Sequence, residues 1–165
     1  MRLHVPLRLR WSDIDAYAHV NNAAMLGLLE EARIQAFWAT ADTATGSEGS
    51  GAAGESSSAV LDGRPGADTL TLVAHQEVEY LRPIPYGRQP LDCELWVPRV
   101  GGSSLDVHYE VWSPKGLEPR VLTTRAATTI VLVDAATQRP RRVTDAERAA
   151  WAPFAEPPTA FSRRR

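Results

Sequence analysis

Residues 10–33 read RWSDIDAYAHVNNAAMLGLLEEAR, and the predicted fold of the whole chain is built around this stretch. Between Asp13 and Asn22 it places two carboxylates, one histidine and two asparagines within ten residues. A long apolar pattern with helical spacing follows at once. Polar groups delivered to the N-terminus of a helix lie beside free backbone N–H groups and the positive end of the helix dipole. We therefore expect the function of the chain to lie here.

The apolar pattern predicts one long helix that begins at Asn21 or Asn22, since asparagine is a good N-cap residue. Ile34 and Trp38 lie almost opposite its main apolar stripe. A helix that is apolar around so much of its circumference is expected to be covered on most sides. The main stripe recurs at helical spacing and consists of Met25, Leu28, Leu29, Ala32 and Ala36.

Composition restricts the class of protein. A chain of 165 residues is long enough for one domain with a single core. The formal net charge of -2 gives no electrostatic reason to expect nucleic acid or an acidic membrane surface. No apolar run approaches the ~20 residues of a membrane span, and the N-terminus lacks a signal-peptide pattern. Because Cys93 is the single cysteine, we expect a buried structural thiol in a cytoplasmic protein.

The rest of the chain is predicted to be mainly β. Weak alternation indicates a first strand over residues 3–12, with Pro6 at an edge or bulge. Four further strands are expected as an antiparallel meander, the last without clean alternation and therefore buried on both faces. A capping box that begins at Thr144 opens a short helix through Trp151. The four strands are predicted over residues 69–80, 91–97, 105–111 and 121–133.

Residues 41–67 are rich in glycine, serine and alanine and interrupt this pattern. Such a composition buries too little apolar surface to offset the entropy of ordering the chain. We interpret the segment as a flexible insertion inside one domain, a passive loop being favoured over a lid. One antiparallel sheet with one long apolar helix is an α+β layout.

The motif D-x-D-x-x-x-H-V-N-N over residues 13–22 resembles that of the hotdog-fold thioesterases of the 4-hydroxybenzoyl-CoA thioesterase type. Glu30 and Arg33 match the E-x-x-R that closes the helix in this family, and further segments match in the same order. The resemblance implies an antiparallel sheet wrapped around one long central helix, as a single hotdog domain over residues 1–152 with a tail over 153–165. It also implies a homodimer or homotetramer with its pockets between subunits. The further segments are residues 80–87, 101–105 and 139–141.

The resemblance gives Asp15 the reacting position, as nucleophile or as general base, and leaves Asp13 structural. Taken alone, either carboxylate is equally consistent with an Asx turn into the helix. His19 and Asn22 complete the candidate catalytic set. The simpler interpretation of His19 is a hydrogen-bonded structural histidine, and that of Asn22 is a helix cap. The helix N-terminus is expected to polarise the thioester carbonyl.

A second group of residues is expected to contact the substrate. Glu30 lies about two turns along the helix, and a buried ion pair is its simpler interpretation. No metal site is expected, because the four histidines are scattered, and no cofactor is expected because coenzyme A enters as part of the substrate. The expected substrate-binding residues are Val20, Asn21, Glu30, Arg82 and Ser104.

The resulting hypothesis is a thioesterase that hydrolyses acyl-CoA, or related acyl thioesters such as those of a carrier protein, to free acid and thiol. Two alternatives stay open. One is a hotdog dehydratase acting on hydroxyacyl thioesters, and the other is a non-catalytic module that binds acyl thioesters. The second alternative depends on Ala18, which stands where the family usually has glycine. Alanine at a position that requires φ > 0 costs on the order of 1 kcal/mol.

Overall fold

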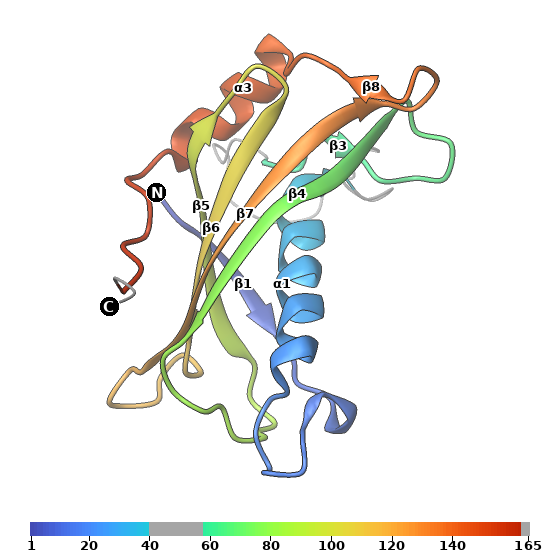
Figure 1. The fold of residues 1–165 in the computed structure, drawn as a ribbon. Helices are drawn as coiled ribbons and strands as arrows, with labels where there is room; N and C mark the ends of the chain where they lie inside the picture. Colours follow the sequence, from blue (N-terminus) through green and yellow to red (C-terminus); the bar gives the residue numbers. More distant parts are fainter. Residues whose placement is uncertain (40–57, 163–165) are drawn as a thin grey trace, which may run out of the picture.

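A computed structural model describes residues 1–39 and 58–162. Within these residues one antiparallel sheet has the strand order β1-β5-β6-β7-β4, and β8 pairs with β7. The long helix α1 (Asn22–Phe37) runs along one face of this sheet (Figure 1). The strands are β1 (Leu3–Leu7), β4 (Thr69–Tyr80), β5 (Leu91–Val100), β6 (Ser104–Trp112), β7 (Leu122–Asp134) and β8 (Arg139–Pro140).

The predicted four-strand meander is wrong in one connection. Strands β5, β6 and β7 follow one another, but β4 joins the sheet beside β7 and not beside β5. With 12 and 13 residues, β4 and β7 are the longest strands of the sheet. Pairing them satisfies the largest number of backbone donors and acceptors. It also makes β4 one edge of the sheet and β1, with Pro6, the other.

Two strand boundaries also differ from the predictions. The first strand ends at Leu7, and a 3-10 turn, η1 (Trp11–Asp13), replaces its expected end. Strand β5 continues through Pro98 to Val100, because an irregularity in its pairing with β6 between Trp96 and Arg99 accommodates the proline.

The helix α1 begins as predicted. The Asn21 side chain accepts hydrogen bonds from the backbone N–H groups of Ala23 (2.8 Å) and Ala24 (3.3 Å), which makes Asn21 the N-cap. The predicted stripe from Met25 to Ala36 is buried against the sheet. The expectation of cover on most sides is not met within one chain, since Leu26 and Ile34 are 41% and 43% exposed. One flank of α1 therefore stays open.

The end of the expected insertion belongs to the core. The Ser58 hydroxyl donates to the Ala36 carbonyl (2.7 Å), and the Ser58 carbonyl accepts from the Trp151 indole (3.2 Å). Leu61 is buried in the short strand β3 (Leu61–Asp62), which pairs in parallel with β2 (Trp38–Ala39). The flexible insertion, predicted over residues 41–67, therefore extended too far at its C-terminal end. Its remaining part falls within residues 40–57, which lie outside the described residues.

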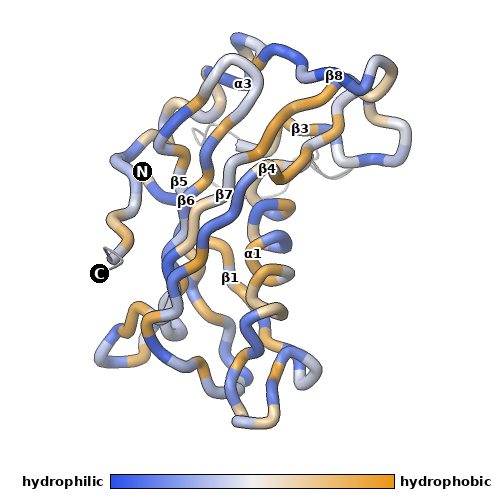
Figure 2. Tube along the Cα trace, viewed as in Figure 1, coloured by the Kyte–Doolittle hydropathy of each residue, from blue (hydrophilic) through white to orange (hydrophobic). Residues whose placement is uncertain are grey.

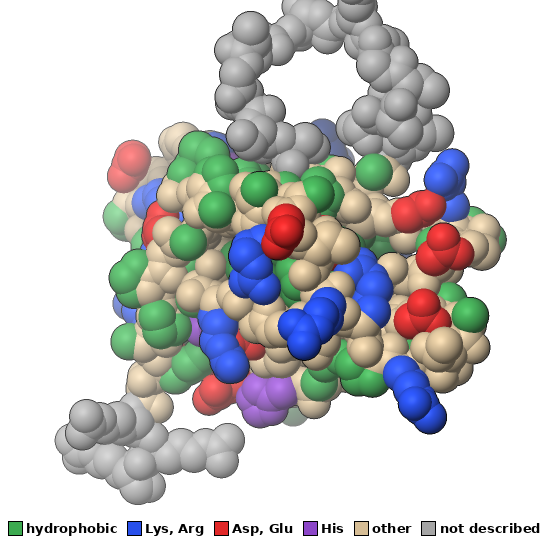
Figure 3. Space-filling view, turned by 90° about the horizontal axis from the view of Figure 1, so that it is seen from above, with side chains coloured by type: hydrophobic (Ala, Val, Ile, Leu, Met, Phe, Trp, Pro, Cys, Tyr) green, Lys and Arg blue, Asp and Glu red, His purple; other side chains and the backbone are tan. Residues whose placement is uncertain are grey.

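The predicted terminal helix is present as α3 (Asp145–Trp151), with the capping box between Thr144 and Glu147. Viewed from the end that carries α3 and β8, arginine and lysine side chains stand out among apolar ones (Figure 3). Two arginines near this end make structural contacts. Arg141 pairs with Glu147 (3.0 Å), and Arg148 donates to the carbonyl oxygens of the turn between β5 and β6. These contacts fasten α3 to the sheet.

After the 3-10 turn η2 (Ala152–Phe154), residues 155–162 run along the sheet face opposite α1 (Figure 1). The Trp96 indole donates to the Pro157 carbonyl (2.9 Å), and the Thr159 N–H donates to His108 Nδ1 (2.9 Å). This cover contributes to burying β5 continuously from Leu91 to Val97. Burial on both faces was expected for β7, whose outward side chains are instead half-buried.

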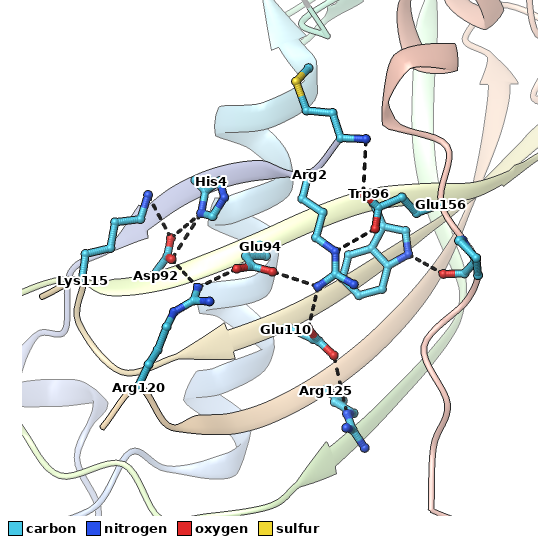
Figure 4. Close-up of polar contacts among 12 residues, drawn as sticks. Arg2, His4, Asp92, Glu94, Trp96, Glu110, Lys115, Arg120, Arg125 and Glu156 are labelled. Atoms are coloured by element: carbon cyan, nitrogen blue, oxygen red, sulfur yellow. Dashed lines mark hydrogen bonds and ion pairs between the residues drawn. The ribbon is translucent and has the colours of Figure 1, made fainter. Parts of the chain in front are cut away.

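The outer side chains of β5 include two buried carboxylates, Asp92 and Glu94, held in a network of ion pairs (Figure 4). Arg120 contacts both carboxylates, at 2.7 and 2.5 Å, and Arg2 contacts Glu94 at 2.8 Å. The Arg2 guanidinium also lies 3.9 Å from the ring centroid of Trp96. Buried charge is tolerated here because it is paired several times over.

Candidate active site

Asp13 anchors the turn between η1 and α1. Its buried carboxylate accepts hydrogen bonds from the Arg10 N–H (2.7 Å) and the Arg10 guanidinium (3.0 Å). Its carbonyl accepts from the Asn21 N–H (2.8 Å). Burial favours the neutral acid, but the hydrogen bonds and charge of Arg10 outweigh it and lower the pKa of Asp13. These contacts are those of a structural residue that fixes the entry to α1.

Asp15 occupies the middle of this turn. Its Oδ1 accepts hydrogen bonds from the backbone N–H groups of Tyr17 (2.8 Å) and His19 (3.2 Å). The other oxygen, Oδ2, has no hydrogen-bond donor among the described residues. The Asx turn and the reacting role are thus compatible, because one oxygen orients the carboxylate while the other stays available.

Ala18 adopts φ = +62°, so the position does require the left-handed conformation that glycine favours. Its N–H donates to the Asp15 carbonyl (3.1 Å), and the Asp15 N–H donates to the His19 carbonyl (2.8 Å). The strained residue therefore closes the backbone loop that carries the carboxylate.

An open cleft of about 370 Å³ lies in front of this turn. The turn contributes Asp15, His19 and Val20, and the first helical residue contributes Asn22. All three candidate catalytic residues therefore line one cavity, together with Val20 and Arg82 of the expected binding set. The remaining lining residues are Met25, Tyr80, Leu81, Pro83, Ile84 and Thr124.

Two hydrogen bonds join the walls of the cleft. The Val20 N–H donates to the Ile84 carbonyl (2.8 Å), and the Tyr80 hydroxyl donates to the Asn22 carbonyl (2.8 Å). Tyr80 and Thr124 were not predicted as site residues from the sequence. Tyr80 stands in the segment of residues 80–87 that resembles the family, and that resemblance was the feature of the sequence that could have identified it as a site residue. Thr124 lies within a strand with no local motif, so only the pairing of β4 with β7 identifies it.

Three residues of the expected binding set lie outside this cleft. Asn21 is used in capping α1. Glu30 is exposed, lines a second cavity farther along α1, and has no ion pair among the described residues, so the buried ion pair is not found. Ser104 begins β6 opposite Val131, and its carbonyl accepts from the Gly101 N–H (2.7 Å).

The helix N-terminus offers fewer free donors than expected. The Asn21 side chain occupies the N–H groups of Ala23 and Ala24, and the Met25 N–H donates to the Asn21 carbonyl. In the described part of the chain the Asn22 N–H has no acceptor. It is therefore the first-turn donor that remains for a ligand oxygen, at the positive end of the α1 dipole.

One group of potential metal ligands lies elsewhere, on the outer face of the sheet. Side-chain ligand atoms of His4, Asp92 and Glu94 lie within 4.8 Å of one another. Arg120 and Lys115 contact Asp92 at 2.7 and 3.5 Å, so its oxygens already have cationic partners. The group is therefore part of the ion-pair network.

The profile of a family described as the Thioesterase-like superfamily matches residues 9–158. Solved structures with the same fold include a candidate thioesterase from Pseudomonas aeruginosa, with 28% identity and a TM-score of 0.65 over 92% of this chain and 97% of that one. A candidate acyl-CoA thioesterase from Xanthomonas campestris has 26% identity and a TM-score of 0.57 over 86% and 98%.

A third structure is a thioesterase from Thermus thermophilus in complex with coenzyme A and zinc. It has 23% identity and a TM-score of 0.62 over 92% of both chains. No curated protein matches the chain. Within the described residues, no helix is long and apolar enough to cross a membrane.

Proposed function

Since the chain belongs to the Thioesterase-like superfamily and has its hotdog fold, we propose that it hydrolyses acyl-CoA thioesters to free acid and coenzyme A. The observation that carries this proposal is the carboxylate of Asp15. It is oriented through Oδ1 by two backbone N–H groups, keeps Oδ2 available, and lines a cleft at the N-terminus of α1. The relatives from Xanthomonas campestris and Thermus thermophilus support coenzyme A thioesters as the substrate class.

Asp15 acts in one of two ways. As a nucleophile, its Oδ2 attacks the thioester carbonyl and the C–S bond breaks, giving a mixed anhydride and a thiolate, and water then hydrolyses the anhydride. As a general base, Oδ2 removes a proton from the water that attacks the same carbonyl. Both routes pass through an oxyanion on the carbonyl oxygen.

The Asn22 N–H is the proposed donor for that oxyanion. It lacks an acceptor among the described residues and lies at the positive end of α1. A single donor of this kind typically contributes ~3 kcal/mol to lowering the barrier. The Asn21 cap supports this role indirectly, because it fixes the first turn of the helix while leaving the Asn22 N–H unoccupied.

The other lining residues have positioning and binding roles in this proposal. His19 and the Asn22 side chain lie beside Asp15 in the lining and would contact the thioester or the water. Arg82 is exposed at the same cleft and has no ion pair among the described residues. A free guanidinium at the mouth suits the phosphates of coenzyme A.

We also propose a homodimer through β4, an edge strand of the sheet whose first half is apolar. The first half of β4 is hydrophobic (Figure 2), and Leu70, Leu72 and Val73 in it are exposed. The open flank of α1, with Leu26 and Ile34, adds further uncovered apolar surface. Such surface favours association, and an edge strand with free N–H and C=O groups is a template for pairing. A monomeric mass by light scattering at micromolar concentration would contradict this.

The test of the activity is thiol release from acetyl-, hexanoyl-, palmitoyl- and benzoyl-CoA, compared between wild type and Asp15→Asn. We expect Asp15→Asn to lower kcat by at least a hundredfold, since amide Oδ1 and Nδ2 supply neither a strong nucleophile nor a base. Asp68→Asn is the matched control, because Asp68 is exposed and outside the cleft. Undiminished hydrolysis by Asp15→Asn would overturn the assignment of Asp15.

The non-catalytic binding module is the second candidate, and the strained φ of Ala18 is the observation that favours it. Binding of acyl-CoA without thiol release from any of the four substrates would establish this candidate in place of the first.

A further inference from the structure

Three aromatic side chains are exposed at the end of the molecule that carries the Asp15 turn. Trp11 of η1 is 75% exposed, Tyr17 of the turn 81%, and Tyr86 of the loop after β4 40%. The other four tryptophans of the chain are buried or half-buried. Exposed large apolar residues are ordinary when they are scattered singly, but contiguous ones mark interaction sites. Here the rings of Trp11 and Tyr86 are in edge-to-face contact, with 5.1 Å between their centroids.

The aromatic residues lie on two segments that the fold joins, residues 8–20 after β1 and residues 81–90 after β4. The Val20 N–H donates to the Ile84 carbonyl (2.8 Å), and an isolated β-bridge adds a second link between the segments. Both segments lie at the end of the molecule opposite α3 and β8 (Figure 1). The exposed rings therefore gather at one end, around the turn that carries Asp15.

Arginines accompany the aromatic residues on these segments, which together contain four arginines and two aspartates. Arg10 pairs with the buried Asp13 (3.0 Å) and lies farther from Glu31 of α1. Arg8 and Arg88 are exposed and have no ion pair among the described residues. The net charge of -2 is a sum over the whole chain, and locally this end has an excess of positive charge.

The proposed dimer leaves the β1 side of this end uncovered, because β1 and β4 are opposite edges of the sheet. Arg8 and Arg10 line a hollow of about 540 Å³ between β1 and α1. Ile34, in the apolar flank that adds to the dimer surface, instead lines the cavity between α1 and β4 with Val73. The two arginines and the adjacent Trp11 therefore stay available when a second copy pairs with β4.

We propose that this end of the molecule docks on the surface of an anionic phospholipid bilayer. Tryptophan and tyrosine favour the interface between headgroups and acyl chains, because their rings are apolar and their N–H and O–H groups are polar. Each arginine near an anionic membrane surface raises the partition coefficient roughly fivefold. The docking surface consists of Arg8, Arg10, Trp11, Tyr17, Tyr86 and Arg88.

Docking brings the cleft of Asp15 to the bilayer. The cleft takes His19 and Val20 from one docking segment and Pro83 and Ile84 from the other. Long acyl chains partition into bilayers, since each buried CH₂ group favours the transfer. A docked molecule therefore meets thioesters with long acyl chains where they accumulate. The docking goes beyond the proposed function and needs no substrate.

The test sediments the full chain with vesicles of phosphatidylcholine alone and with vesicles that also contain phosphatidylglycerol. We expect binding to the anionic vesicles at low salt and its loss at high salt, because salt screens exposed charges. Arg8→Gln/Arg88→Gln should lower the partition coefficient roughly tenfold or more. Arg139→Gln/Arg142→Gln is the matched control, since it removes two exposed arginines at the opposite end and should change binding little.

The fluorescence of Trp11 provides a second measurement. Anionic vesicles should shift the emission of wild type to shorter wavelength, because the exposed indole leaves water on docking. Trp11→Phe should abolish this shift, and Trp11→Ala should also weaken sedimentation with the vesicles. Far-ultraviolet circular dichroism shows whether each variant keeps the fold.

Three results would overturn the inference: no binding to anionic vesicles, binding that the two double variants weaken equally or not at all, and a fluorescence shift that persists in Trp11→Phe. Binding of an acidic acyl-carrier protein without binding to vesicles would also overturn it, and would assign the surface to a protein partner. Because vesicle binding is measured without a thioester, its failure leaves the proposed function intact, and a failure of thiol release leaves the docking intact.

Discussion

At the scale of single residues, the backbone of Ala18 is the most constrained point of the candidate site. Its positive φ closes the loop that presents Asp15, and alanine pays for this conformation where glycine does not. Only the backbone of this residue is involved, since its side chain is exposed. The departure from the family glycine is therefore a cost in stability, and the thiol-release assay decides whether it is also a cost in turnover.

Ala18→Gly should stabilise the chain by roughly 1 kcal/mol, because glycine relieves the left-handed strain. The free energy of unfolding in urea measures the effect. Ala16→Gly is the control, since Ala16 is exposed in the same turn and lacks a positive φ. That substitution should be neutral or destabilising, and a gain in both variants would show that strain at Ala18 is not the cause.

At the scale of elements, the two asparagines before α1 have different tasks. Asn21 caps the helix through its side chain, whereas Asn22 lines the cleft and its N–H has no acceptor among the described residues. The sequence alone allowed either residue to be the cap. The choice depends on the backbone of the preceding turn, which the contacts of Asp13 with Arg10 and Asn21 determine.

Asn21→Ala should lower the free energy of unfolding by about 1 kcal/mol, because two first-turn N–H groups lose their acceptor. Asn22→Ala is the matched comparison and should change stability much less, since its side chain has no hydrogen bond among the described residues. Urea unfolding of both variants distinguishes them. Equal losses would contradict the separate roles.

The elements themselves were largely predictable because their patterns are local. The stripe from Met25 to Ala36, the alternation in β6 and the capping box at Thr144 each lie within one element. The partner of β4 was not predictable, since neighbouring hydrophobic strands have similar patterns. The same reason made the sheet side of the cleft unpredictable, because Thr124 of β7 lines the cleft only as a result of the pairing of β7 with β4.

At the scale of the whole molecule, the two ends of the chain meet on the outer face of the sheet. Arg2 contacts Glu156 (2.9 Å), and the N-terminal ammonium donates to the Pro153 carbonyl (3.2 Å). Contacts between residues so far apart in the chain carry no local signal, so the sequence predicted only a tail from residue 153 onward. In the structure Arg2 and His4 of the N-terminal segment contact the carboxylates Glu94 and Asp92 of β5, and the tail pairs with Arg2 through Glu156.

These carboxylates predict how the stability of the molecule depends on pH. Burial raises the pKa of Asp92 and Glu94, but their cationic partners outweigh it and hold both pKa values below the ordinary range. The unfolded chain therefore binds protons first as the pH falls, so the stability contributed above about pH 4 is lost through the depressed pKa values.

Arg120→Gln removes the cation that bridges both carboxylates, and should move the acid-unfolding midpoint to higher pH. Circular dichroism from pH 7 to 2 measures this midpoint, with Arg88→Gln, at an exposed arginine without an ion pair among the described residues, as the control. An unchanged midpoint in Arg120→Gln would show that the network does not set the acid limit of the fold.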